Sequence, residues 1–326
     1  MATKCKTYYF VCVLSFLFMS NNVPYSFAIE KDNRKDNCII DASIIITPTI
    51  GYRIDNMDWN IAGDLNGQNP NILSELKFND VKTYQSGITA RLVVNGFYMR
   101  HSFSYGRIID GESIDSDYSS DNRTGLFSKS EATIKNYDVQ DIDLCFGYQF
   151  SFIQNRLKIA PLIGSSYHKL NYCITKGYQI VPEKKPIPGL KSSYNAKWKG
   201  YLYGLDIVCK AAKDIFIFST VEYHTVDYEA TADWNLRDDF SHPVSFTHLA
   251  DGNGYVVKIG VTNKLTKNLK IGVMYNWQKW SAKNGEDRTF VMSENAICTR
   301  LNQVNFTSRS INVFLLVGIN LSGVTI

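Results

Sequence analysis

The chain has 326 residues, of which 44% are hydrophobic and 13% aromatic, and its formal net charge is +4 at pH 7. After the N-terminal segment there is no run of about 18 apolar residues, which excludes transmembrane helices. The small net charge gives no argument for a nucleic-acid partner. The seven cysteines show no CxxC or zinc-type spacing, so neither a metal nor a cofactor is expected.

Residues 1–28 are typical of an export signal. Lys4 and Lys6 form a short positive region, and 8–19 is an apolar run too short to span a bilayer. Ser26 and Ala28 place small residues at the −3 and −1 positions of a cleavage site. We therefore expect removal of residues 1–28 and a mature chain that starts near Ile29.

Period-2 alternation of apolar with polar or small residues recurs through the rest of the chain and predicts strands. It is clearest in 142–150, 269–277 and 311–321, where every second residue is apolar. Alternate side chains of a strand face opposite sides, so each stretch has one apolar face and one mixed face. Strands are expected near 42–60, 73–94, 97–114, 136–152, 156–177, 194–210, 215–233, 247–262, 268–280 and 306–321.

Short and long connections alternate between these strands. The short ones lie near 95–96, 154–155, 212–214 and 263–267, and the long polar ones near 62–72, 116–135, 179–193, 234–246 and 281–305. An outer-membrane barrel has this rhythm because its periplasmic turns are tight and its extracellular loops are long. We predict an all-β, transmembrane, antiparallel up-and-down β-barrel of about ten strands over residues 29–326. A secreted β-sandwich is the alternative, but its strands are usually about five or six residues long.

Residues near the predicted strand ends resemble the omptins, ten-stranded outer-membrane aspartyl-type proteases. Gly111-Glu112-Ser113-Ile114-Asp115-Ser116-Asp117-Tyr118 is similar to the omptin Asp-x-Asp segment, and 223–235 is similar to the strand that ends in an Asp-x-His pair. The resemblance implies that an Asp pair and an Asp–His pair face each other across a cleft. It assigns Asp115, Asp117 and Asp233 to three of these four positions.

The fourth position, where the omptins have the histidine that acts as general base, is Asn235. An amide has no useful proton affinity near neutral pH, so it cannot replace imidazole. Of the five histidines, His242 and His248 lie in or beside the following loop and can fold back, but no spacing requires it. We therefore expect an omptin-like outline in which an enzymatic activity is uncertain and proteolysis is a minority interpretation.

The missing histidine and the Gly-x-x-Ile-Asp-Ser-Asp-Tyr segment are more similar to a second group, the omptin-shaped outer-membrane porins of chlamydia-related (Protochlamydia-type) bacteria. That resemblance implies a small porin in the bacterial outer membrane. Polar residues on the mixed strand faces are expected to line the lumen, among them Asp141, Asp143, Asp206, Lys258 and Lys270. Ten strands leave only a narrow or plugged path, because wide channels need about sixteen.

Two alternatives to a channel stay open. One is a surface adhesion or structural barrel, for which the long polar loops argue, and the other is a protease with a degenerate site at Asp115, Asp117 and Asp233. The expected partners are outer-membrane lipid or lipopolysaccharide, with small solutes or host surface molecules as further possibilities.

Overall fold

A computed structural model describes residues 39–292, 296–320 and 324–325. The predicted signal segment lies outside the described residues. The described elements are strands: β1 (Ile39–Ile40), β2 (Ala42–Ile61), β3 (Ser74–Val94), β4 (Phe97–Ser120), β5 (Thr124–Ile134), β6 (Asp138–Tyr148), β7 (Phe150–Phe152), β8 (Leu157–Val181), β9 (Lys185–Lys210), β10 (Ile215–Asp233), β11 (Phe246–Lys264), β12 (Leu269–Thr289), β13 (Ile297–Asn320) and β14 (Val324–Thr325).

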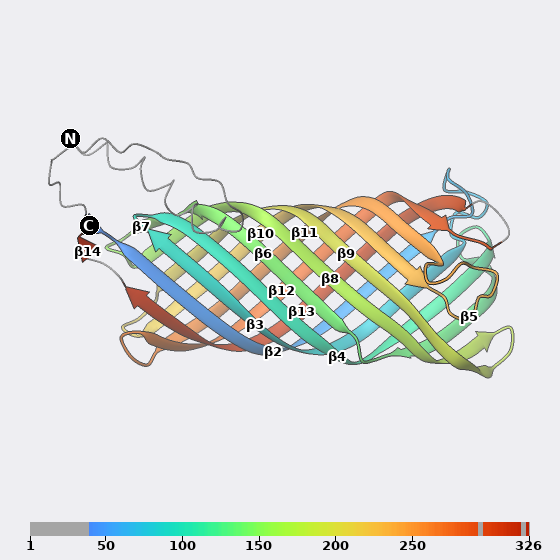
Figure 1. Ribbon diagram of the computed structural model, residues 1–326, viewed down its shortest axis with the longest axis horizontal. Coiled ribbons are helices and arrows are strands. Elements are labelled where there is room, and N and C mark those ends of the chain that lie inside the picture. The colour runs from blue at the N-terminus through green and yellow to red at the C-terminus, as the bar shows by residue number, and fades with distance from the viewer. Residues whose placement is uncertain (1–38, 293–295, 321–323, 326) are drawn as a thin grey trace, which may run out of the picture.

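The strands β2 to β13 form one antiparallel sheet that closes on itself (Figure 1). Closure comes from the ladder between β13 and β2, with Phe306 opposite Met57. The strands β5, β6 and β7 follow one another along a single position of the wall between β4 and β8. The twelve strands of the described sheet therefore occupy ten wall positions, which confirms the predicted barrel.

The two ends of the barrel differ in their connections. At the end where Figure 1 labels β7 and β14, β3 and β4 are joined by Asn95 and Gly96 alone, both with positive φ (50° and 88°). Such a turn matches the twist of a hairpin. At the other end the chain makes longer excursions at 62–73 and 234–245. By the rule for outer-membrane barrels, the end with tight turns faces the periplasm and the other end is extracellular.

Three of the five predicted long loops are wrong. The segments 116–135, 179–193 and 281–305 lie mostly in strands, because β4, β8 and β12 continue to Ser120, Val181 and Thr289 before the chain turns. The fourth wall strand accordingly begins at Thr124 and not near 136. The sequence pattern fails there because apolar alternation marks only the lipid-facing part of a strand, whereas the backbone ladder continues into water.

The strand β10 shows where the wall leaves the lipid. Its outward side chains from Ile215 to Tyr223 are apolar apart from Ser219, and they are polar from Thr225 onward, with Asp227 and Glu229 exposed. Tyr223 lies opposite Tyr203 on one side and Tyr255 on the other, which forms part of an aromatic belt. The apolar stretch has the length of about ten residues that a tilted strand needs to cross a bilayer. The remaining strand length projects beyond the outer leaflet.

Inside the barrel the polarity of the side chains changes in the opposite direction along the axis. On the extracellular side the inward side chains form an aromatic layer of Trp59, Phe78, Tyr172, Tyr194, Trp198, Tyr228, Phe246 and Trp280. Trp59 stacks on Tyr194 with ring centroids 5.9 Å apart, although β2 and β9 lie on opposite sides of the ring. This contact fills the width of the lumen with side chains.

Closer to the periplasm the lumen is crossed by charged groups, which we call the central charge layer: Arg53, Asp55, Arg100, Asp141, Asp143, His168, Asp206, Glu222, His224 and Lys258. The Arg100 guanidinium contacts Asp206 at 2.6 Å and also Glu222, from strands on the far side of the barrel. Arg53 bridges Asp55 and Asp141, each at 2.7 Å. Buried charges of this kind are stable only when they are paired.

Arg100→Met therefore leaves Asp206 and Glu222 without their main counter-charge. We expect this substitution to lower the free energy of unfolding by about 3–5 kcal/mol. The matched control is Arg309→Met, because Arg309 is exposed on the outer wall and forms no ion pair within the described residues. Denaturant unfolding in detergent micelles measures both, and equal effects of the two substitutions would contradict the role assigned to the layer.

Candidate functional site

Asp115 and Asp117 lie near the extracellular end of β4. Ser74 of β3 and Ser128 of β5 are the cross-strand neighbours of Asp117 and donate hydrogen bonds to its carboxylate. Burial and the nearby charge of Asp117 raise the pKa of Asp115 to about 8. The Arg237 guanidinium opposes this rise at both carboxyls but does not cancel it. The pair therefore binds a proton more readily than two isolated carboxyls do.

Asp233 and Asn235 do not form the pair that the resemblance implied. The side chains of Tyr228, Ala230 and Ala232 are buried in the barrel, so Asp233, one residue further along β10, points to the outer side. The Asn235 side-chain amide is held by hydrogen bonds within the rim. It accepts hydrogen bonds from the Lys191 backbone N–H (2.8 Å) and the Ser192 hydroxyl (3.1 Å), and it donates to the Gly189 carbonyl (2.9 Å).

A histidine does reach Asp233, from the loop that follows. His242 Nδ1 lies 2.6 Å from Asp233 Oδ1, and this contact raises the pKa of His242. His248 is instead buried, 3.1 Å from Asp287 and 3.0 Å from the Tyr194 hydroxyl. Within the described residues no hydrogen bond or ion pair joins the Asp115–Asp117 pair to the Asp233–His242 pair. The sequence allowed a loop histidine to fold back but could not single out His242, because the contact depends on how the twelve-residue excursion 234–245 folds.

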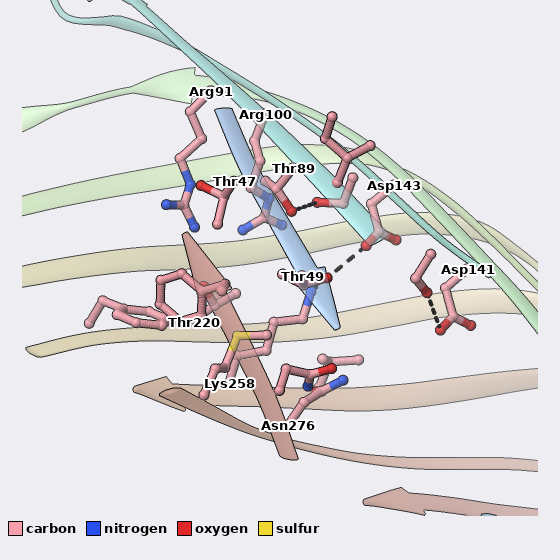
Figure 2. Close-up of a pocket in the computed structure, with 18 of the residues that line it drawn as sticks. Thr47, Thr49, Thr89, Arg91, Arg100, Asp141, Asp143, Thr220, Lys258 and Asn276 are labelled. Carbon is pink, nitrogen blue, oxygen red and sulfur yellow. Dashed lines mark hydrogen bonds and ion pairs between the residues drawn. The ribbon is translucent and has the colours of Figure 1, made fainter. Parts of the chain in front are cut away.

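The lumen holds a second candidate site. A cavity of about 130 Å³ lies below the central charge layer, and Thr47, Thr49 and Thr89 are among its lining residues (Figure 2). Arg91 projects beside it, and its buried Nε has no hydrogen-bond partner within the described residues. The five lumen residues expected from the sequence face the barrel interior, four of them lining this cavity and the fifth, Asp206, bound to the Tyr98 hydroxyl.

The periplasmic mouth below this cavity is basic. The charges of Lys158, Lys210 and Lys264, from three different strands, act on Lys270. Lys264 and Lys270 are direct cross-strand partners, an arrangement that like charges normally disfavour. None of the four lysines forms an ion pair within the described part of the chain. Lys270 is held by the Phe216 ring, with Nζ 3.4 Å from the ring centroid. The mouth therefore offers uncompensated positive charge.

A scan against family models matches residues 47–319 to the family described as Protochlamydia outer membrane protein. The chain belongs to this family. The barrel thus lies in the outer membrane, as the sequence predicted. No curated protein matches the sequence.

Solved structures similar to this family member are outer-membrane barrels. The outer membrane protease OmpT from Escherichia coli has a TM-score of 0.67 at 14% identity, over 87% of this chain and 98% of that chain. The outer membrane protein OprG from Pseudomonas aeruginosa has a TM-score of 0.31 at 9% identity, over 85% and 95% of the two chains. At this identity the first likeness shows the fold alone.

Two further searches of the described residues gave no candidates. No set of three or more His, Cys, Asp or Glu side chains is arranged to hold a metal ion among the residues described. No helix in the same part of the chain is long and apolar enough to span a membrane.

The Asp233–His242 contact makes the order of loop 234–245 depend on pH. Because Asp233 raises the pKa of His242, the contact stabilises the loop fully below the ordinary histidine value of about 6.5 and loses its effect as pH rises through the raised value. We expect hydrogen–deuterium exchange, corrected for intrinsic rates, to show stronger protection of 234–245 at pH 6 than at pH 9. Asp233→Asn should remove the difference, and a difference that survives in this variant would contradict the assignment.

Proposed function

We propose that this barrel is a narrow outer-membrane channel that is closed in the present conformation and admits anions from its periplasmic mouth. The observation that carries the proposal is the basic mouth, which opens into a polar cavity inside a membrane-spanning wall. Uncompensated Lys and Arg side chains around an entrance favour anions over cations. The threonine hydroxyls and Arg91 above the mouth supply hydrogen-bond donors for a partly dehydrated anion.

The closed state has a structural basis in the aromatic layer. Trp59 and Tyr194 meet across the lumen, and Phe78 contacts Tyr172 with ring centroids 4.7 Å apart. These four rings are almost fully buried, and together with the rest of the aromatic layer they fill the lumen at this level. Conduction therefore requires the aromatic side chains to move, and the open state is a minor population.

Trp59→Ala removes one partner of the stacked pair that closes the lumen. An aromatic pair stabilises by about 0.5–1.5 kcal/mol beyond its burial, so we expect the open fraction to rise about two- to tenfold. Planar-bilayer recording of refolded protein measures this as more frequent steps. Trp277→Ala is the control, since Trp277 lies on the outer face of β12. Silence of both the native protein and Trp59→Ala would overturn the channel.

Charge selectivity tests the role of the mouth separately. In a salt gradient the native channel should show a reversal potential with the sign expected for anion selectivity. The double substitution Lys264→Glu and Lys270→Glu reverses the charge of the cross-strand pair and should move that potential toward cation preference. An unchanged potential would mean that these lysines do not line the conducting path.

The second candidate is a permanently closed surface barrel, and the observation in its favour is that both the aromatic layer and the central charge layer cross the lumen. Its partner surface would be the outer wall above the aromatic belt. There Lys197 and Lys199 of β9 and Lys169 of β8 project outward, with Lys169 opposite Lys197. These lysines suit the anionic head groups of outer-leaflet lipid. Bilayer silence, together with loss of host-surface binding after loop replacement, would favour this candidate.

Proteolysis has less support than either of these functions. Asn235 is fixed by three hydrogen bonds within the rim, and the histidine that reaches Asp233 comes from the loop. The carboxyl pair on β4 faces Arg237 and has no contact to that histidine within the described chain. Retention of any peptide cleavage in an Asp115→Ala variant would therefore indicate a contaminating protease.

A further inference from the structure

His168 occupies an unusual position in the central charge layer, between two carboxylates of the same strand. Its Nδ1 lies 3.0 Å from Asp141 Oδ1, and its Nε2 lies 3.8 Å from Asp143 Oδ1. The ring is almost fully buried and packs on Trp280 at 4.5 Å between centroids. His168 Nε2 and Asp143 Oδ1 are too far apart for a hydrogen bond, and neither atom has another hydrogen-bond partner within the described residues.

A neutral imidazole cannot satisfy both contacts. It carries one N–H, so donating to Asp141 from Nδ1 leaves the Nε2 lone pair facing the Asp143 carboxylate, and two acceptors then oppose each other. The imidazolium carries an N–H on each nitrogen and can serve both carboxylates, with a small closing movement on the Asp143 side. The geometry therefore suits a ring that has bound a second proton.

His224, which lies 5.9 Å from His168 between ring centroids, needs no second proton. Its Nδ1 lies 2.9 Å from the Ser166 hydroxyl, which can donate, and its Nε2 lies 3.5 Å from Glu222 Oε2, which can accept. One neutral tautomer, with its N–H on Nε2, suits both neighbours, although Nε2 and Glu222 Oε2 also form no hydrogen bond within the described residues. The chain thus contains a matched pair of buried histidines, packed on the same Trp280 ring, of which only one lies between two acceptors.

The number of charged groups around the two rings also indicates one bound proton. The carboxylates are Asp141 and Asp143 of β6, Asp55 of β2, Asp206 of β9 and Glu222 of β10. The cations are Arg53 of β2, Arg91 of β3, Arg100 of β4 and Lys258 of β11, with Arg91 acting on Asp206. With both histidines neutral, the carboxylates outnumber these cations by one. A single proton on His168 balances the layer together with Arg91.

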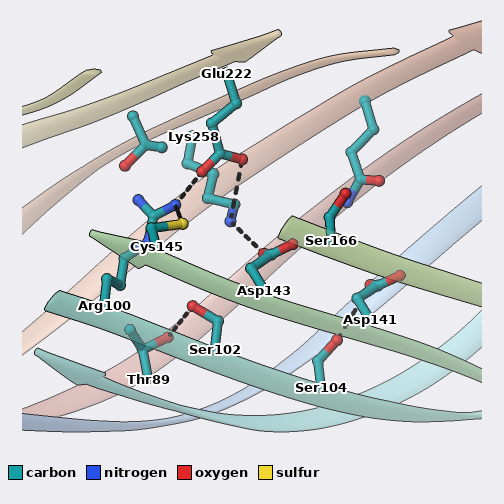
Figure 3. A network of polar contacts seen from close by, with 12 residues as sticks. Thr89, Arg100, Ser102, Ser104, Asp141, Asp143, Cys145, Ser166, Glu222 and Lys258 are labelled. Carbon is teal, nitrogen blue, oxygen red and sulfur yellow. Dashed lines mark hydrogen bonds and ion pairs between the residues drawn. The ribbon is translucent and has the colours of Figure 1, made fainter. Parts of the chain in front are cut away.

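We propose that His168 is a proton-binding site that controls a latch across the lumen, the Asp143–Lys258 contact, so that acidification releases the latch and favours the open barrel. The regulatory consequence rests on the channel proposed above, whereas proton binding does not. Lys258 shows how the latch acts, because its Nζ lies 3.9 Å from Asp143 Oδ2 and 4.0 Å from Glu222 Oε2 (Figure 3). Asp143 of β6 lies across the lumen from Lys258 of β11, whereas Glu222 of β10 lies on the strand next to Lys258. When His168 binds its proton, Asp143 gains a second cationic neighbour, and its cross-lumen contact with Lys258 weakens.

Trp280 provides a readout of proton binding that is independent of conduction. A positive charge on the ring packed against it changes the electrostatic environment of the indole. We expect the emission of the native protein in micelles to change between pH 8 and pH 5, and Trp280→Phe to remove that change. His168→Gln should remove it as well, and the matched control His224→Gln should retain it. Loss in His224→Gln with retention in His168→Gln, or no change in the native protein, would overturn the proposal.

Asp143→Asn is the second variant, in case His168→Gln does not fold. Its amide can donate to His168 Nε2, so the neutral ring becomes sufficient and proton uptake moves to lower pH. An unshifted titration in this variant would also overturn the proposal.

Bilayer recording then tests the regulation. The open fraction of the native channel should rise as pH is lowered from 8 to 5, and His168→Gln should abolish this dependence. A pH dependence that persists unchanged in His168→Gln would overturn the latch. If no variant conducts, the channel fails, while the emission titration still decides whether His168 binds the proton.

Discussion

The backbone ladder between β13 and β2 is the constraint on which the rest of the molecule depends. In hydrocarbon an unpaired N–H or C=O costs several kcal/mol, so a sheet can cross the membrane only when it has no edge. Closure in ten wall positions fixes the circumference, and the circumference fixes what the interior can hold. A wall of this size encloses side chains rather than a wide aqueous channel. The interior contacts of this protein, such as Trp59 on Tyr194, follow from that limited width.

The wall has opposite polarity on its two faces, and this inversion divides the molecule along its axis. Where the outer face is apolar and contacts lipid, the inner face carries the ion pairs of Arg53, Arg100 and their carboxylate partners. Where the outer face becomes polar and projects into water, the inner face becomes aromatic. The projecting half is therefore held by a core like that of a soluble protein. The membrane half is held by paired charges and leaves room for a polar cavity open toward the basic mouth.

This division assigns different properties to the two ends. At the extracellular end the rim is held by hydrogen bonds of Asn235 and by the Asp233–His242 contact. The periplasmic end carries the unpaired lysine charge and the cavity. Between them the central charge layer contains the group whose protonation state can alter contacts across the lumen, His168. In the channel that we propose, control therefore lies within the barrel wall.

The sequence by itself determined the barrel, its approximate strand number, the orientation of its lumen residues and its family resemblance. It could do so because period-2 alternation and turn residues are local features of the sequence. Contact with lipid requires apolar side chains on the outer face, so the alternation is clear in the membrane-spanning part. It also placed Asp115 and Asp117 near the top of β4. Only the tertiary structure decided that strands continue through 116–135, that His242 pairs with Asp233, and that Asn235 fastens the rim. Only the fold, too, set His168 between Asp141 and Asp143 beside Trp280. These contacts join residues far apart in the chain, and closure of the sheet, not local sequence, brings them within reach.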